Sequence, residues 1–508
     1  MAAPLSLTPR RVGYTVALVA LAGGLLTLNR SLIGVFYDDG LYAGLGWALA
    51  HGWGYVHPNL PGAPAAVHYP PLYPAVLAPL VGALSLPAAA IVARLLNVSF
   101  AAAAWGLVAW HATRTELLGA GAPRWLAAVL VAAAALAIPW LTVLGVLLSE
   151  PLFALLLAAT IVLADRPLPP GGPGAVRAAL LVGVCAALAL LTRSIGIAAG
   201  AGVAAYGWAV RRDGWRAALA AALPVALASL GWGLWIARHR AGIDPDLASD
   251  YGSYFETVRA AGLGALGSST ADLARPLGVL TLGWAPSRLV YLAFGIPAIG
   301  VGLYGLMLLA RRSAIGLTLA GYLVILGVWP FPPDRFLWAV LPWLGLAWAA
   351  GAVALWRRAW PRIPVAVLAL ALTAGYVRYQ WKGFAGHWWD YAASRISSNF
   401  SELLPGLDSL PATAVLATDN EPLVWLYVRR PMVPLYLFRY QGRQLLEPPA
   451  AVQRAYLERE GVTHVLLSGA GTSSARELTR LRAAYPAWLT PVRDWPGGRI
   501  LYEVRHDR

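Results

Sequence analysis

Apolar runs long enough to cross a lipid bilayer recur along roughly the first three-quarters of this chain of 508 residues. A membrane-spanning helix needs about 20 predominantly apolar residues, and on this criterion the sequence predicts about eleven spans. They are expected near residues 12–34, 88–110, 124–141, 147–164, 176–192, 195–211, 216–237, 289–310, 314–330, 336–356 and 363–379. Only 12% of the residues are charged, against about 25% in soluble domains. The sequence therefore predicts an α-helical polytopic membrane protein.

The distribution of basic residues predicts which side each loop faces. Cytoplasmic loops of membrane proteins carry an excess of Lys and Arg. Of the 39 basic residues only Lys382 is a lysine, and the arginines gather in alternate connections, whereas residues 36–87 contain none. The arginines of these connections all fall on one side of the membrane if the short apolar run 71–86 lies in the membrane interface and does not cross the bilayer. We therefore expect a multi-pass protein of the bacterial inner (plasma) membrane, with a cytoplasmic N-terminus and loop 36–87 outside.

The chain is predicted to divide into a transmembrane domain, residues 1–379, and an extracytoplasmic C-terminal domain, residues 380–508. In the second domain, buried-strand runs alternate with helical patterns. Strands are expected at 414–417, 462–467 and 499–504, and helices at 448–461 and 473–485. This alternation predicts a small α/β unit with a partly parallel sheet.

Two adjacent carboxylates, Asp38 and Asp39, lie in the first outer loop. Charged groups at a membrane edge are costly unless water, a cation or a substrate meets them. The pair is therefore a candidate catalytic site, with one acid as general base and the other orienting it or holding a divalent cation. They could instead be solvated loop acids, or a cap for a helix over 40–51. No ligand spacing demands a metal.

Three further charged residues stand where charge is scarce. Glu150 lies in an almost unbroken apolar stretch and needs a partner or a wet cavity, which makes it a further candidate catalytic residue. Alternatively, or in addition, Ser149 caps a helix and Glu150 complements its dipole. Arg193 and Arg335 are isolated on the outer side, where arginine suits phosphate binding. Membrane-interface snorkelling, or for Arg335 a salt bridge with Asp334, is the alternative.

These motifs together resemble the GT-C superfamily of polytopic glycosyltransferases. The resemblance covers residues 10–380 and is closest to protein O-mannosyltransferases, aminoarabinose transferases and related transferases acting on lipopolysaccharide. It is carried by the acidic doublet, by Pro70-Pro71-Leu72-Tyr73-Pro74, by Ser149-Glu150-Pro151-Leu152-Phe153 and by Leu191-Thr192-Arg193.

The resemblance implies a polyprenyl-phosphate sugar donor and inversion at the anomeric carbon. Asp38 matches the catalytic aspartate of the family, while Asp39 stands where glutamate is usual. Tyr69, beside His68, stands where many members have lysine. The donor phosphate is therefore expected at Arg335 and Arg193, with His68 and Tyr69 as further contacts.

The predicted partners are the lipid-linked donor, a glycan, lipid or protein acceptor, and the bilayer. Nucleic acid is not expected, because the arginines are scattered between apolar runs. The alternative function is a transporter or flippase of lipid-linked sugars, which would place charges near the bilayer midplane and often show two similar halves. A non-enzymatic membrane scaffold is a third interpretation, but it leaves the acidic pair without a purpose.

Overall fold

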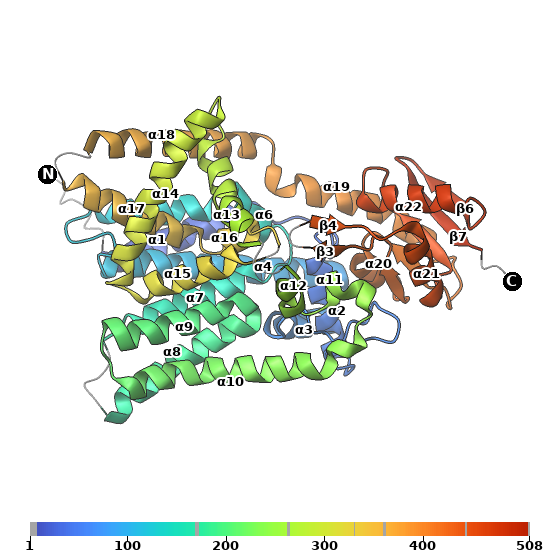
Figure 1. Cartoon of the computed structure of the whole chain (residues 1–508), viewed down its shortest axis with the longest axis horizontal. Coiled ribbons are helices and arrows are strands. Elements are labelled where there is room, and N and C mark those ends of the chain that lie inside the picture. The colour runs from blue at the N-terminus through green and yellow to red at the C-terminus, as the bar shows by residue number, and fades with distance from the viewer. Residues whose placement is uncertain are drawn as a thin grey trace.

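The computed structural model describes residues 8–167, 172–261, 265–329, 331–358, 362–441 and 444–505. A large helical body occupies one end of the long axis, and a small unit containing a β-sheet occupies the other (Figure 1). The prediction of a helical protein with a small C-terminal α/β unit is confirmed for the described residues.

The helices of the first half of the chain are α1 (Pro9–Leu25), α2 (Asp38–Ala50), α3 (Leu72–Ala83), α4 (Leu86–Arg114), α5 (Arg124–Ala135), α6 (Ile138–Leu144), α7 (Glu150–Ala164), α8 (Gly172–Thr192), η1 (Ser194–Gly196), α9 (Ile197–Ala205), η2 (Tyr206–Val210), α10 (Trp215–His239), η3 (Arg240–Gly242), η4 (Pro245–Leu247) and α11 (Ala248–Tyr251).

Those of the second half are α12 (Tyr254–Ala261), α13 (Ala265–Leu282), α14 (Arg288–Ala310), α15 (Ala314–Gly327), α16 (Asp334–Trp338), α17 (Leu341–Trp356), α18 (Arg362–Ala385), α19 (Trp388–Leu403), η5 (Leu404–Leu407), α20 (Glu421–Val428), α21 (Ala450–Arg459) and α22 (Ser473–Ala484). The strands are β1 (Leu416–Thr418), β2 (Met432–Pro434), β3 (Arg439–Gln441), β4 (Gln444–Leu446), β5 (His464–Leu467), β6 (Leu489–Trp495) and β7 (Arg499–Val504).

Several helices are long and apolar enough to cross a membrane. Among the described residues there are five, or up to six if the bent pair of α5 and α6 is one span. The five contain α4, α8, α10, α14 and α18, each of which matches a predicted span. Five shorter apolar helices accompany them. The predicted count of about eleven spans is therefore not confirmed.

The predicted span 12–34 is wrong in its second half, because α1 ends at Leu25. In the loop that follows, the Asn29 side chain accepts a hydrogen bond from the Ser31 amide at 3.0 Å and donates to the Gly145 carbonyl at 3.0 Å. Local bonds of this kind compete with a helix for the backbone. Residues 26–37 therefore form a loop in place of the predicted helix, and this loop leads directly to Asp38.

Proline interrupts other predicted spans. The α5–α6 pair bends by 54° just before Pro139. The expected span 336–356 is divided into α16 and α17, with Pro342 in the first turn of α17. Proline has no amide hydrogen and is tolerated at a helix start but not inside it. The run 71–86 forms α3, whose 12 residues span about 18 Å, too short for a bilayer core of about 30 Å.

Helices α14 and α17 pack closely at glycine. A Cβ on Gly305 would overlap the Ala347 backbone, whereas one on Gly300 of the same helix meets nothing within 4 Å. We expect Gly305→Val to destabilise the protein by about 1–3 kcal/mol, as overpacking usually does. Thermal unfolding in detergent measures this. Gly300→Val, the same change on an open face, should leave the melting temperature unchanged; equal losses in both variants would contradict the close packing.

The C-terminal sheet has the strand order β2-β1-β5-β7-β6. β1 pairs in parallel with β2 and β5, and β7 pairs antiparallel with β5 and β6, which confirms the partly parallel sheet. The sequence did not predict β2, which has only three residues, or β6, which contains Pro491 and is mostly exposed.

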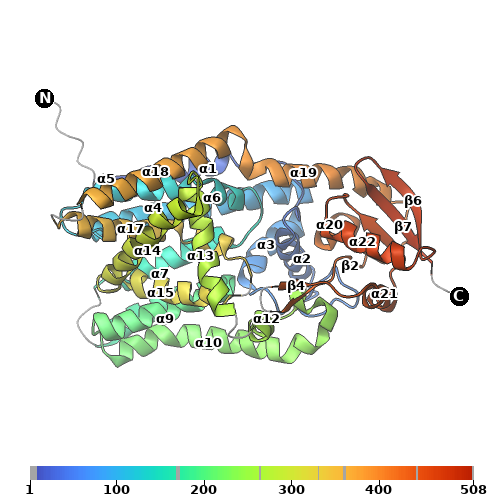
Figure 2. The same cartoon turned by 45° about the horizontal axis from the view of Figure 1, so that its top comes forward.

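The sheet docks on the loop region between the membrane helices through α20, which contacts both β2 and α2. Figures 1 and 2 both show α2 between the helical body and the sheet. α20 follows the carboxyl end of β1 directly. Residues at the carboxyl end of β1 therefore lie close to the start of α2, where Asp38 is located.

Candidate active site

The backbone just before α2 adopts a rare conformation. Tyr37 has φ 67° and ψ −66°, and the Asp38 amide donates to the Phe36 carbonyl at 2.8 Å. These are the features of a γ-turn with positive φ, which is strained for any residue except glycine. Such conformations cost about 1–3 kcal/mol and persist where the surroundings impose them.

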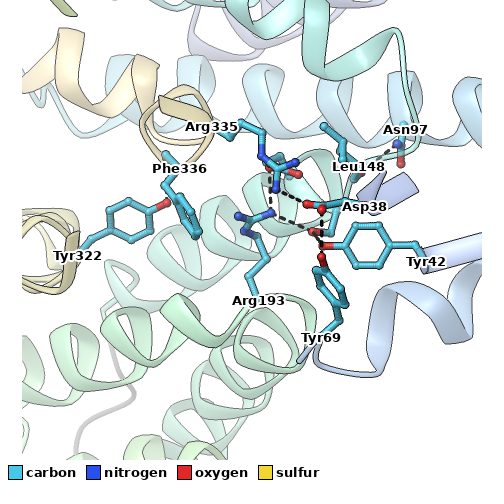
Figure 3. A network of polar contacts seen from close by, with 11 residues as sticks. Asp38, Tyr42, Tyr69, Asn97, Leu148, Arg193, Tyr322, Arg335 and Phe336 are labelled. Carbon is cyan, nitrogen blue, oxygen red and sulfur yellow. Dashed lines mark hydrogen bonds and ion pairs between the residues drawn. The ribbon is translucent and has the colours of Figure 1, made fainter. Parts of the chain in front are cut away.

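This turn places the Asp38 carboxylate between two side chains from distant parts of the chain (Figure 3). Arg335 of α16 donates to its Oδ2 at 2.6 Å, and the Tyr69 hydroxyl donates to its Oδ1 at 2.9 Å. Burial raises the pKa of Asp38, but the charge of Arg335 and the two hydrogen bonds outweigh burial, so the pKa lies below its ordinary value. Asp38 is therefore ionised at neutral pH.

Glu150 extends this ion pair into an alternating cluster. Its carboxylate is fully buried and lies 2.9 Å from Arg193 Nη1 and 3.4 Å from Arg335 Nε. Neither oxygen receives a well-aligned hydrogen bond from the described residues. Asp38, Arg335, Glu150 and Arg193 thus alternate in charge, which offsets the cost of burying each of them. We call these four residues the charge cluster.

Polar and aromatic side chains enclose the charge cluster. Ser149 Oγ lies 3.1 Å from both Arg193 Nη1 and the Tyr42 hydroxyl. The Arg193 guanidinium carbon is 4.4 Å from the centroid of the Phe336 ring, and that of Arg335 is 5.0 Å from the Phe36 ring. Aromatic faces attract guanidinium groups and leave their N–H donors free at the edge.

Asp39 is turned away from the charge cluster. It is fully buried and accepts hydrogen bonds from the backbone amides of Gly34 and Phe36, each at 2.9 Å. Burial raises its pKa to about 6, although these two bonds lower it. The structure therefore does not bring Asp39 together with the other predicted catalytic residues; Asp39 closes the loop before the γ-turn.

His68 lies behind Tyr69. Its Nδ1 is 2.6 Å from the Gly252 carbonyl, and its ring centroid is 4.0 Å from that of Tyr254. Burial lowers its pKa to about 4, so the imidazole is neutral and donates to that carbonyl. The His68 ring also packs against that of Tyr69, with centroids 4.6 Å apart, and it is Tyr69 that reaches Asp38.

A divalent cation between Asp38 and Asp39 does not fit this arrangement. Both Asp39 oxygens already accept amide hydrogens, and Asp38 is paired with a guanidinium. In the described part of the chain, no group of three or more His, Cys, Asp or Glu side chains could hold a metal.

Glu150 does begin α7, with Ser149 at the N-cap position, so the helix-start alternative holds beside the contacts with the charge cluster, whereas those for the two arginines do not. Ser149 makes no capping hydrogen bond to α7, and its hydroxyl serves the charge cluster. Arg335 pairs with Asp38 and not with Asp334. Arg193 is only 7% exposed, which is not the environment of a snorkelling side chain.

A cavity of about 550 Å³ lies beside α16. The residues directly before Arg335 contribute to it, and most of its wall is apolar. Its lining residues are Pro139, Asp272, Arg275, Pro276, Val279, Leu280, Pro332, Pro333, Asp334, Trp338, Tyr379 and Leu445. Asp334, the neighbour of Arg335 in the chain, lines this cavity, whereas the four residues of the charge cluster are not in its lining.

Sequence reasoning missed two contributors to this region. Tyr42 could have been found, because position i+4 on a helix lies on the same face as Asp38. Glu421 could not, since it lies 384 residues from its partner Tyr37 and nothing local marks it.

No model of a known protein family matches this sequence, and no curated protein matches it. Solved structures do. The archaeal oligosaccharyltransferase AglB from Archaeoglobus fulgidus, in complex with an inhibitory peptide and a dolichol-phosphate, is similar with a TM-score of 0.51 and 12% identity, over 97% of this chain and 74% of that one. ArnT from Cupriavidus metallidurans, bound to undecaprenyl phosphate, gives 0.46 and 15%, over 96% and 97%. Arabinofuranosyltransferase AftD from Mycobacteria gives 0.48 and 17%, over 98% and 42%.

The likeness to AglB extends over nearly the whole chain, and at this level of identity it shows the fold. The chain thus has the same fold as this oligosaccharyltransferase, in agreement with the GT-C fold that its motifs predicted.

Proposed function

We propose that this chain, which has the GT-C fold, is a membrane glycosyltransferase that moves a sugar from a polyprenyl-phosphate carrier to an acceptor hydroxyl. The observation that carries the proposal is the charge cluster: a partly exposed carboxylate, Asp38, held by one arginine and close to a second. A general base next to two phosphate-binding groups is what displacement of a lipid phosphate by an alcohol requires.

The donor phosphate would bind to Arg335 and Arg193. Both guanidinium groups are held in place by carboxylates and aromatic rings, and arginine binds phosphate through two parallel hydrogen bonds. The apolar cavity beside α16 suits the start of an isoprenoid chain. AglB was solved with a dolichol-phosphate, which is consistent with a lipid-linked donor here.

Binding of the phosphate would also prepare the base. In the structure Arg335 is paired with Asp38. When the phosphodiester of the donor takes up this guanidinium, Asp38 keeps Tyr69 as its remaining hydrogen-bond partner, and burial then raises the pKa of the carboxyl group. Asp38 becomes a stronger base when, and only when, the donor is in place.

The reaction would then proceed in line. Asp38 takes the proton from the acceptor hydroxyl as its oxygen attacks the anomeric carbon on the face opposite the phosphate. The bond from the anomeric carbon to the phosphate oxygen breaks, and the electron pair leaves with the polyprenyl phosphate. Arg335 and Arg193 stabilise the charge that develops on that oxygen. Glu150 holds the two arginines in position, and Asp39 holds the loop that precedes Asp38.

The proposal places this site on the extracytoplasmic face. The arginine distribution supports it, with residues 1–379 in the membrane of a bacterial cell and residues 380–508 outside. A carrier lipid reaches such a site by lateral diffusion, whereas a nucleotide sugar made in the cytoplasm does not.

Purified protein in vesicles, given a radiolabelled polyprenyl-phosphate sugar and an extract of cell-envelope acceptors, should transfer label to an acceptor. We expect transfer to require intact donor and to release polyprenyl phosphate in equal amount. Movement of labelled lipid across the vesicle membrane without transfer would favour the transporter and overturn the proposal.

A further inference from the structure

The strained turn at Tyr37 needs an explanation, because it sets the direction in which Asp38 leaves the backbone. Tyr37 is not glycine, yet its φ is 67°. Asp39 accepts hydrogen bonds from the amides of Gly34 and Phe36, which precede Tyr37. Those bonds do not hold the Tyr37 side chain in place. A conformation of this kind is retained only where surrounding contacts determine it.

The Tyr37 side chain is fixed by the C-terminal domain. Its hydroxyl donates a hydrogen bond to Glu421 Oε1, at the first residue of α20. The Tyr251 hydroxyl donates to the same oxygen at 2.6 Å, and Asn59 Nδ2 donates to the Tyr251 hydroxyl at 2.7 Å. Glu421 is 1% exposed and Tyr251 is fully buried.

The start of α20, with its N-cap Asn420, also contacts the backbone on both sides of the turn. Asn420 donates to the Gly34 carbonyl at 2.7 Å. The backbones approach so closely that a Cβ on Gly34 would lie 2.6 Å from Leu423 Cβ, and one on Gly40 would lie 2.9 Å from Pro422 Cβ. Side chain and backbone contacts from one short helix therefore converge on a single strained turn.

We propose that Glu421 is a positioning residue, which holds Tyr37 in its strained turn so that Asp38 meets Arg335 and the acceptor, and that the C-terminal domain thereby completes the active site. This rests on the proposed function of Asp38 as the base. Glu421 touches neither the charge cluster nor a substrate; it acts through the tyrosine that precedes the base. Small misplacements of a reacting group reduce rate strongly, whereas binding elsewhere in the site is left intact.

The first test separates kcat from the KM for donor. Tyr37→Phe, which keeps the ring and removes the hydroxyl, and Glu421→Ala should lower kcat by about 10- to 100-fold. The KM for donor should stay within about two-fold, because Arg193, Glu150 and their contacts are untouched. Glu421→Gln, which retains an acceptor oxygen, should recover most of the rate.

Glu477→Gln is the matched control. Glu477 is also a buried carboxylate of the C-terminal domain, but it lies on α22 and pairs with Arg480. Its substitution should leave kcat per folded molecule unchanged. If Tyr37→Phe retains the full kcat, or if Glu477→Gln lowers kcat as much as Glu421→Ala does, the positioning role is refuted.

A second measurement does not depend on sugar transfer. Amide hydrogen exchange of residues 32–40 should be faster in Glu421→Ala and Tyr37→Phe than in the parent protein, and unchanged in Glu477→Gln. Unchanged exchange in the first two variants contradicts the proposal even if no transfer assay succeeds. If exchange is faster in these two variants but the parent protein transfers no sugar, the positioning contact is supported and only the proposed glycosyltransferase reaction is refuted.

The pH dependence supplies a third measurement. Burial raises the pKa of Glu421 to about 7, although bonds from Tyr251 and Tyr37 lower it. Asp250, Asp419 and Tyr456 are the other titratable groups that interact with it. A carboxyl group whose pKa is higher in the folded than in the unfolded protein stabilises the fold at a pH below its pKa in the unfolded protein. This stabilisation is lost as the pH rises through the pKa in the folded protein. The melting temperature should fall between about pH 5 and pH 8, and by less in Glu421→Gln; equal falls would count against this environment for Glu421.

Discussion

Asp38→Asn should reduce sugar transfer by about 10³-fold, since general-base catalysis contributes 10²–10⁴. Asparagine keeps the size of the side chain and an oxygen that can accept from Tyr69, but it cannot take up a proton. Donor binding should remain, because Arg193 and Glu150 are unchanged. Initial rates of label transfer at saturating donor measure the effect.

Asp244→Asn is the control for this variant. Asp244 forms an ion pair with Arg459 at 2.6 Å on the surface, and exposed pairs contribute about 0–1 kcal/mol. Its transfer rate should equal that of the parent within about two-fold. Transfer by Asp38→Asn at the parental rate would remove the assignment of Asp38 as the base.

Arg335→Gln should lower kcat/KM by about 10²–10³-fold, which is the range for loss of one donor that stabilises developing charge. The variant also changes the pH profile. Burial of Asp38 is no longer offset by the guanidinium, so the pKa of the carboxyl group rises and the acid limb of kcat/KM moves to higher pH. Rates across a pH series at low donor concentration report both changes.

Arg240→Gln is the matched substitution at an exposed arginine, which pairs with Glu256 at 3.2 Å. It should alter neither rate nor pH profile. An acid limb that stays in place in Arg335→Gln would show that Arg335 does not control the protonation of the base.

Most residues of the candidate site could be predicted because they are charged residues in an otherwise apolar sequence. Glu150, Arg193 and Arg335 each stood alone in a stretch where burial of charge is costly. Such residues must find opposite charges, and in the structure they find one another and Asp38. Which residue pairs with which could not be predicted, because the pairs join different helices.

The roles of the acidic doublet could not be separated from sequence. Asp38 and Asp39 are chemically identical neighbours, and only the turn at Tyr37 directs one carboxylate to the charge cluster and the other to backbone amides. Helix breaks at Pro139 and Pro342 were readable in principle, whereas the end of α1 depends on Asn29 bonding to Gly145.

The segment before Asp38 is translated well before its bonding partners, which lie 365 and 394 residues further along the chain. The amides of Leu32 and Ile33 donate to Ser397 Oγ and to the Tyr427 hydroxyl, each at 2.9 Å. Chains fold as they emerge, N-terminal parts first. A chain released before residue 397 could insert its apolar helices but would lack these anchors. We therefore expect this loop to acquire its final shape only after residues 397 and 427 have left the ribosome.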